Sequence, residues 1–212
     1  MHNKTLIFLL LPLFFLALGS TIAIKSGSAA YRSQIPDLCN SSASSAGGHV
    51  LICPEGDGKT LSYAGATITV TLKDYNGDPI PGVPAADFWL IGCLDGINLC
   101  GGSRSINADH PTDANGQTTI SGTIIGGGCD DGLHVVALGI LVGCPPTSLQ
   151  IKVRSPDING DLTVDLVDFV TFALGFPNPP NSYDECLDFN DDGVINLIDV
   201  ALFALHFVHS CS

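Results

Sequence analysis

The feature that most constrains the fold is a string of oxygen-bearing side chains that occurs twice near the C-terminus. The segments DINGDLTVDLVDFVTFALGF and DFNDDGVINLIDVALFALHF begin 31 residues apart and share nine identical positions. In both segments Asp or Asn stands at alternate positions, and an apolar run follows directly. Apolar residues surround most of each run, so the runs predict two helices that must pack against each other in water. The expected core residues of this pair are Phe172, Phe176, Phe203 and Phe207.

The spacing of the polar side chains in both segments is that of a calcium-binding loop. A calcium ion takes about six to eight oxygen ligands, which such a loop supplies from places 1, 3, 5, 7, 9 and 12, with only a backbone carbonyl at place 7. An acidic, solvated turn is the alternative, but a full ligand set that occurs twice in register favours two Ca²⁺ ions. The expected ligands are Asp157, Asn159, Asp161, Thr163, Asp165 and Asp168 in the first loop, and Asp188, Asn190, Asp192, Val194, Asn196 and Asp199 in the second.

One position distinguishes the two loops. Place 6 is Gly193 in the second loop and Leu162 in the first. The turn at this place favours a positive φ, which costs a residue with a Cβ about 1 kcal/mol. We therefore expect the first loop to bind Ca²⁺ more weakly than the second.

A loop followed by a helix, twice, with no helix before either loop, resembles the dockerin family over residues 157 to about 208. The resemblance implies a small all-α module at residues 156–212, a half EF-hand pair that binds two Ca²⁺ ions and docks on a cohesin-type domain. It also implies a role in anchoring extracellular proteins, often ones that degrade polysaccharides.

The residues expected to face the partner depart from the family pattern. Places 10 and 11 tend to carry Ser or Thr in the dockerins of cellulosomes, and the recognition helix usually carries basic residues further along. Here these places are apolar and the basic residues are absent. An exposed apolar pair in each repeat predicts a hydrophobic contact that salt affects little. The expected contact residues are Leu166, Val167, Leu197 and Ile198.

The residues before this module predict an all-β Ig-like sandwich at residues 36–154. In ATITVTLKD, apolar Ile68, Val70 and Leu72 alternate with Thr residues, which is the period of a half-buried strand. The segments DFWLIG, QTTISGTII, LHVVALGILV and SLQIKVR predict further strands, with clusters of Gly, Pro and Asn between them. Short strands separated by such turns are typical of an antiparallel sandwich.

Two turn sequences of this region carry a resemblance of their own. VTLKDYNGDPIPGV followed by TDANGQTTISGTI resembles the bacterial Ig-like modules of invasin-type surface proteins. The match covers about half of the region and rests on turn chemistry. It therefore implies a fold and says little about function.

The N-terminus predicts export. Lys4 precedes thirteen residues, Leu6 to Leu18, that are apolar apart from one proline, and small residues follow. This core is short for a bilayer, which needs roughly 20 apolar residues. Residues 1–30 are therefore interpreted as a secretory signal peptide, with cleavage after Gly19 or Ala30 left open. We expect a secreted protein, extracellular or at the cell surface, with no membrane attachment after cleavage.

The charge of the chain is concentrated in its last quarter. The net charge is −13, and residues 157–212 hold ten Asp or Glu and no Lys or Arg. Such acidity argues against nucleic acid or an anionic membrane as a partner. A cation is the favoured ligand.

Eight cysteines beyond the predicted signal peptide indicate a disulfide framework, because their number is even and the chain is exported. Pairing between nearest neighbours is the simplest scheme, although sequence alone cannot fix connectivity. It predicts no free thiol, six cysteines paired within the sandwich, and the last two paired with each other. A CxxC pair is absent, which argues against zinc. The cysteines are Cys39, Cys53, Cys93, Cys100, Cys129, Cys144, Cys186 and Cys211.

The sequence lacks the motifs of an enzyme. GxSxG and HExxH are absent, and Asp109 beside His110 in a Pro-containing loop is typical of a solvated turn. We therefore expect a non-catalytic protein whose dockerin-like module anchors an Ig-like domain to a cohesin-type or other extracellular partner.

Two alternatives remain open. The chain could be a small component or hydrolase of a polysaccharide-degrading complex. It could also be a structural surface protein whose calcium module docks on its own Ig-like domain. Whether the four apolar residues at places 10 and 11 are exposed or buried discriminates between docking on a partner and docking on the chain itself.

Overall fold

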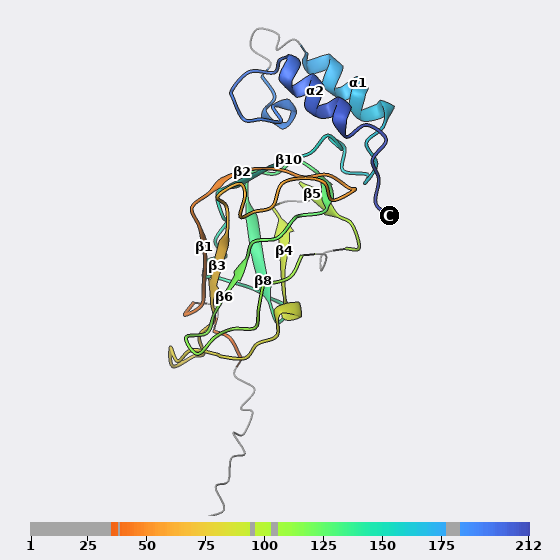
Figure 1. Cartoon of the computed structure of the whole chain (residues 1–212). Helices are drawn as coiled ribbons and strands as arrows, with labels where there is room; N and C mark the ends of the chain where they lie inside the picture. Colours follow the sequence, from red (N-terminus) through yellow and green to blue (C-terminus); the bar gives the residue numbers. More distant parts are fainter. Residues whose placement is uncertain (1–34, 38, 94–95, 103–105, 177–182) are drawn as a thin grey trace, which may run out of the picture. The chain divides into compact units, whose positions relative to one another are not determined.

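Two three-stranded sheets face each other across a shared apolar core in the computed structural model of the chain (Figure 1). The structure describes residues 35–37, 39–93, 96–102, 106–176 and 183–212. The predicted signal peptide, residues 1–30, lies outside the described residues. Residues Gln34–Ser212 form one compact unit.

The first sheet has the strand order β1 (Ser42–Ser45), β3 (Ile68–Thr71) and β6 (Gln117–Ile120), and both pairs are antiparallel. Along β3 the apolar side chains of Ile68 and Val70 are fully buried, while the threonines between them are partly exposed. The predicted alternation of this strand is therefore confirmed.

The second sheet has the order β4 (Phe88–Gly92), β8 (Leu133–Ala137) and β9 (Ile140–Leu141), again antiparallel. A short 3₁₀ helix, η1 (Ala85–Asp87), leads into β4. The buried side chains of β4 and β8 meet those of β3 and β6 in one hydrophobic cluster. The coarser part of the prediction, an all-β sandwich ahead of a small helical part, is thus confirmed.

Two further two-stranded sheets complete the strands that the structure describes. Strand β5 (Ile97–Leu99) pairs antiparallel with β7 (Gly126–Gly128), but β2 (Gly48–Leu51) pairs parallel with β10 (Ile151–Arg154). The parallel pair differs from the predicted purely antiparallel sandwich. A tight hairpin can join only antiparallel strands, so local turn signals could not reveal a pair formed by strands about 100 residues apart.

The helical part contains the only two α-helices among the described residues, α1 (Leu166–Gly175) and α2 (Leu197–Leu205), with a 3₁₀ helix η2 (Glu185–Leu187) between them. Phe172 and Phe203 stack with ring centroids 5.6 Å apart and are buried, as predicted. Phe176 is partly buried against them, whereas Phe207 is 40% exposed. None of the helices that the structure describes has the length and apolarity to cross a bilayer.

Arg154, the last residue of β10, joins the sandwich to the helical part. Its side chain is fully buried and donates hydrogen bonds to three backbone carbonyls, those of Asp130, Val153 and Glu185. Its guanidinium also pairs with the carboxylates of Asp131 at 2.6 Å and Glu185 at 3.2 Å. Because a buried guanidinium is stable only when its donors are satisfied, these partners fix η2 against the end of β10.

Apolar and close backbone contacts extend this junction. Leu51, at the end of β2, belongs to the hydrophobic cluster of the helical part rather than to that of the sandwich. A Cβ added to Gly127 would overlap the carboxylate of Asp157, so glycine in β7 permits the first loop to lie directly on the strand. The Asn98 side chain donates to the Gly160 carbonyl at 2.6 Å. A residue of the sandwich therefore completes the hydrophobic core of the helical part, and the first loop packs directly on the sandwich.

The disulfides differ from the predicted nearest-neighbour scheme, which is wrong. Within the sandwich Cys39 pairs with Cys144. Two other bridges connect the sandwich to the helical part, Cys100–Cys211 and Cys129–Cys186.

Cys53 and Cys93 are not bridged, so the prediction that no thiol is free is wrong as well. The pairs join residues 57 to 111 positions apart in the sequence, because tertiary packing, and not proximity along the chain, brings the partners together. Three disulfides are typical of a protein exported to an oxidising compartment.

We expect Arg154→Met to lower the free energy of unfolding by about 2–4 kcal/mol, because three carbonyls lose their donor and two carboxylates lose their counter-charge. Lys152→Met is the matched control on the same strand. Lys152 pairs with Asp191 at 2.7 Å but is 42% exposed, so its loss should cost at most about 1 kcal/mol. Chemical denaturation in millimolar Ca²⁺, followed by Trp89 fluorescence, measures both. Equal costs for the two variants would contradict the central role of Arg154.

Candidate functional site

The residues at place 12 of the two loops lie in the first turns of the two helices. Asp168 and Asp199 occupy the N3 position of α1 and α2, and each accepts a hydrogen bond from the backbone N–H of the N-cap residue, Asp165 or Asn196. The N-cap side chains accept in return from backbone N–H groups of the first turn. These capping boxes explain why each helix starts at place 10.

The carboxylates at place 1 hold the loops from inside. Asp157 accepts hydrogen bonds from the N–H groups of Asp161 and Leu162, and Asp188 accepts from those of Asp192 and Gly193. The residues at places 1 and 12 are buried, with at most 1% of their surface exposed. The Tyr183 hydroxyl donates a third hydrogen bond to Asp188, at 2.6 Å. An ionised carboxylate offers about four acceptor positions, so these donors leave part of the capacity at place 1 for another partner, and they leave more of it in Asp157 than in Asp188.

The remaining predicted ligands lie around these buried groups. Asn159 donates from its side chain to the Asp161 carboxylate at 3.0 Å, and Asn190 donates to Asp192 at 2.8 Å. Thr163 forms a β-bridge with Ser210, and the Val194 carbonyl lies 3.3 Å from the Asn196 amide. The side chains at places 3 and 5 thus bond to each other in both loops.

The crowding of carboxylates changes their acidity. Burial, with a contribution from Asp168 and Asp161, raises the pKa of Asp157 to about 6. Burial also raises the pKa of Asp199, with contributions from Asp188 and Asp192. Burial and the neighbouring carboxylates disfavour the charged forms of these two groups, and a bound cation would oppose this effect.

Both loops adopt positive φ at places 4 and 6. In the first loop these residues are Gly160 (φ 69°) and Leu162 (φ 72°), and in the second they are Asp191 (φ 56°) and Gly193 (φ 85°). Each loop therefore places one glycine and one other residue in the left-handed region. Asp tolerates this region better than Leu does. The weaker Ca²⁺ binding expected of the first loop stays a prediction, and this difference in backbone strain is its physical reason.

The four residues predicted to contact a partner are all on the surface. Leu166, Val167, Leu197 and Ile198 are 65%, 57%, 73% and 53% exposed. An apolar groove of about 390 Å³ lies beside them between the two helices, with Phe169, Val200 and Phe207 among its lining residues. The residues at places 10 and 11 are therefore not the ones that bind the sandwich.

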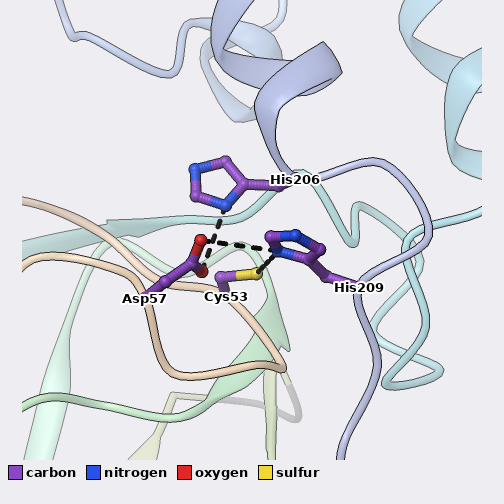
Figure 2. A group of neighbouring side chains, drawn as sticks. All are labelled: Cys53, Asp57, His206 and His209. Atoms are coloured by element: carbon purple, nitrogen blue, oxygen red, sulfur yellow. Dashed lines mark hydrogen bonds and ion pairs between the residues drawn. The ribbon is translucent and has the colours of Figure 1, made fainter.

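A second cluster, which the sequence did not reveal, connects the sandwich to the C-terminal tail. Cys53 and Asp57 follow β2, while His206 and His209 follow α2, and Figure 2 shows the four side chains pointing toward one another. We call them the Cys–His cluster. One donor atom from each residue lies within 4.8 Å of the others, and no second group of His, Cys, Asp and Glu among the described residues is gathered so closely. The loop carboxylates are thus spread more widely than this cluster.

Hydrogen bonds and ion pairs connect the four side chains of the Cys–His cluster. The Cys53 Sγ lies 3.4 Å from Nδ1 of His209, and the Asp57 carboxylate lies 3.2 Å from Nδ1 of His206 and 3.5 Å from Nδ1 of His209. Partial burial acts to raise the pKa of Asp57, but the Cys53 thiol and the two imidazoles outweigh it and hold the pKa below its usual value. On its outer side, Nε2 of His209 lies 3.0 Å from the carboxylate of Glu55.

The contact of a thiol with an imidazole could also indicate a nucleophile, but the surroundings of Cys53 argue against it. A catalytic cysteine is partly exposed and has a lowered pKa. Cys53 is fully buried, and burial raises the pKa of its thiol to about 12. The only trace of the cluster in the sequence is the HFVH spacing of His206 and His209, since Cys53 lies more than 150 residues earlier.

Comparison with known proteins places the chain in no family. No family model and no curated protein matches it. Among solved structures, the filamin domain of Lin-41 matches with 19% identity and a TM-score of 0.31, over 55% of this chain and 95% of that one. The adhesin InvE of Yersinia pseudotuberculosis matches with 22% identity and a TM-score of 0.33, over 58% of this chain but only 28% of the adhesin. Similarities this remote give no information about the function of this chain.

We expect Gly193→Ala to weaken Ca²⁺ binding at the second loop about five-fold, because Ala would pay about 1 kcal/mol for the positive φ. A Cβ at Gly193 meets nothing within 4 Å, so the substitution isolates the backbone cost. Leu162→Gly should strengthen the first loop. Gly77→Ala is the matched control, since Gly77 has φ 83° and open space but lies in a turn of the sandwich. Calorimetric titration should resolve two unequal sites in the unmodified chain; two equal sites would contradict the expectation.

Proposed function

We propose that the chain is an exported, non-catalytic binding protein whose two calcium-loaded loops order a helical docking surface on a β-sandwich. The partner would be a cohesin-type domain or another extracellular protein with an apolar surface. The observation that carries this proposal is the exposure of an apolar pair at the head of each helix, at the same two places in both repeats. A paired apolar surface on an exported protein is typical of an interface.

The donor set of the loops supports Ca²⁺ as their ligand. Each loop offers carboxylates at places 1, 5 and 12. The carboxylates at places 1 and 12 are buried, and the module contains no Lys or Arg. Hard oxygen donors of this kind suit Ca²⁺ and suit softer metals poorly. Binding would exchange the hydrogen bonds between the side chains at places 3 and 5 for contacts with the ion. In this proposal Ca²⁺ stabilises the loops, and thereby fixes the start of each helix.

The surface that we assign to the partner lies apart from the contacts with the sandwich. The sandwich meets η2 through Arg154, meets the first loop through Gly127 and Asn98, and meets the C-terminal tail through a disulfide. None of these contacts uses places 10 and 11. The helical part can therefore be held by its own sandwich and still present both apolar pairs to another molecule.

A second candidate function is structural. Two disulfides, a buried arginine and a shared apolar cluster join the helical part to the sandwich. These contacts favour a role in which the calcium module stiffens a surface protein through its own sandwich. This alternative needs no partner at the exposed face, which is where the two candidates differ.

We expect the quadruple variant with Asp at positions 166, 167, 197 and 198 to lose partner binding in Ca²⁺ while still taking up two ions. None of the four side chains is a predicted ligand, and charges at these positions oppose burial in an apolar contact. The measurement is capture of a partner from the secreted fraction of the source organism, with and without chelator. Binding of the captured partner to each variant is then quantified.

Tyr75→Asp is the matched control, because Tyr75 is 83% exposed on the sandwich and far from the helices in sequence. It should bind as the unmodified chain does. If the quadruple variant binds equally well, the docking surface is wrong. If no partner binds the unmodified chain but chelation still destabilises it, the structural candidate is favoured.

A further inference from the structure

The Cys–His cluster has no part in the proposed docking surface, yet it gathers four donor groups of the kinds that transition metals prefer. Its members come from the segment after β2 and from the segment after α2, about 150 residues apart in sequence. We infer that Cys53, Asp57, His206 and His209 form a binding site for one Zn²⁺ ion that joins the C-terminal tail to the sandwich.

The distances within the cluster fit a tetrahedral ion. With Zn–N of about 2.0–2.1 Å and Zn–S of about 2.3 Å, ligand atoms around zinc lie about 3.3–3.6 Å apart. Nδ1 of His206 lies 3.2 Å from Oδ1 of Asp57, and Nδ1 of His209 lies 3.5 Å from Oδ2 of Asp57 and 3.4 Å from Sγ of Cys53, which are distances of this size. Asp57 thus presents one carboxylate oxygen to each imidazole, and binding of the ion through a single oxygen requires its carboxylate to rotate. All four atoms lie within 4.8 Å, so the remaining pairs need to close by roughly 1 Å. Asp57 is 45% exposed and can make this adjustment.

The chemistry of the donors selects zinc over calcium. A thiolate and two imidazoles are soft or borderline ligands, which suit Zn²⁺ and are avoided by Ca²⁺. One thiolate and one carboxylate would also neutralise the two charges of the ion. Four protein ligands close the coordination sphere, which is typical of a structural zinc site and not of a catalytic one.

Glu55 supplies the outer contact that zinc-binding histidines usually have. Its carboxylate lies 3.0 Å from Nε2 of His209, while Nδ1 of the same ring faces Cys53. A histidine that binds a metal through one nitrogen commonly donates its other N–H to a carboxylate, which fixes the tautomer and the orientation of the ring. Glu55 is therefore a positioning residue of the site.

The cluster is partly open to solvent, so an ion can enter, and an ion bound there would cross-link the C-terminal tail to the sandwich. Cys53 and His206 are buried, but His209 and Asp57 are in part open to solvent. The tail that carries His209 continues to Cys211, which is bridged to Cys100 of the sandwich. The ion would thus add a second cross-link to the same tail, and would use a cysteine that no disulfide occupies.

The other unbridged cysteine provides a matched comparison. Cys93 lies 3.3 Å from Nε2 of His134 and 3.4 Å from the Ser148 hydroxyl. It has a histidine neighbour, as Cys53 has, but belongs to no group of three or more donors among the described residues. Cys93 should therefore contribute nothing to zinc binding.

The test is titration of the full exported chain, with its disulfides formed, by Co²⁺ in excess Ca²⁺, which keeps the oxygen-rich loops occupied. We expect one Co²⁺ per chain, the intense visible bands of a tetrahedral ion and a near-ultraviolet thiolate-to-cobalt absorption. One equivalent of Zn²⁺ should remove all of these bands. A cobalt ion bound only by the oxygens of a loop gives neither signal, so success here does not depend on the calcium proposal.

The variants assign the ligands. Cys53→Ser should abolish the thiolate absorption, and His209→Asn should weaken Zn²⁺ binding by roughly 100-fold or more. Glu55→Gln should weaken it about 10- to 100-fold without changing the spectrum. Cys93→Ser should change neither. Circular dichroism and Ca²⁺ uptake establish that each variant is folded.

The experiment tests the proposal even if Cys53→Ser does not fold. The thiolate absorption of the unmodified chain and of Cys93→Ser is then compared. The proposal is overturned if the unmodified chain gives no thiolate absorption at one equivalent of Co²⁺. It is also overturned if Cys93→Ser removes that absorption. In either case the four residues form a network of ion pairs and hydrogen bonds only.

Discussion

The buried guanidinium of Arg154 is the interaction on which the arrangement of the two parts depends. The last strand of the sandwich ends at this residue, and the first loop begins at Asp157, so almost no linker separates them. Two short helices bury too little apolar surface to be stable alone. Here Leu51 fills their core from the sandwich, and the bridge from Cys129 to Cys186 fixes η2 beside Arg154. The helical part is therefore built on the sandwich rather than attached to it by a flexible chain.

Local signals in the sequence predicted the local structure well. The alternation around Ile68 predicted β3, and the repeat predicted helices that begin at Leu166 and Leu197. Features that depend on tertiary packing were missed. The parallel pair of β2 with β10, the long-range disulfides and the Cys–His cluster all join segments far apart in the sequence. No periodicity or spacing encodes such contacts, and the absence of a CxxC motif argued against zinc although distant residues can assemble a zinc site.

Two groups of donor side chains that suit different cations lie in different parts of the chain. The loops present carboxylate and amide oxygens, which suit Ca²⁺, and the proposed role of that ion is to order the helix starts that carry the exposed apolar pairs. The Cys–His cluster presents sulfur and nitrogen, which suit Zn²⁺, and lies where the tail meets the sandwich. In this proposal Ca²⁺ orders the loops beside the docking surface, and Zn²⁺ holds the C-terminal tail against the sandwich.

The most direct test of this account is non-reducing peptide mapping of the exported chain by mass spectrometry. A helical part fixed on its own sandwich predicts bridges from Cys129 to Cys186 and from Cys100 to Cys211, with Cys53 recovered as a free thiol. A bridge between Cys186 and Cys211, with every cysteine of the sandwich paired within the sandwich, would contradict it. That result would mean a helical module covalently independent of the sandwich, with no thiol left at the Cys–His cluster to bind a metal.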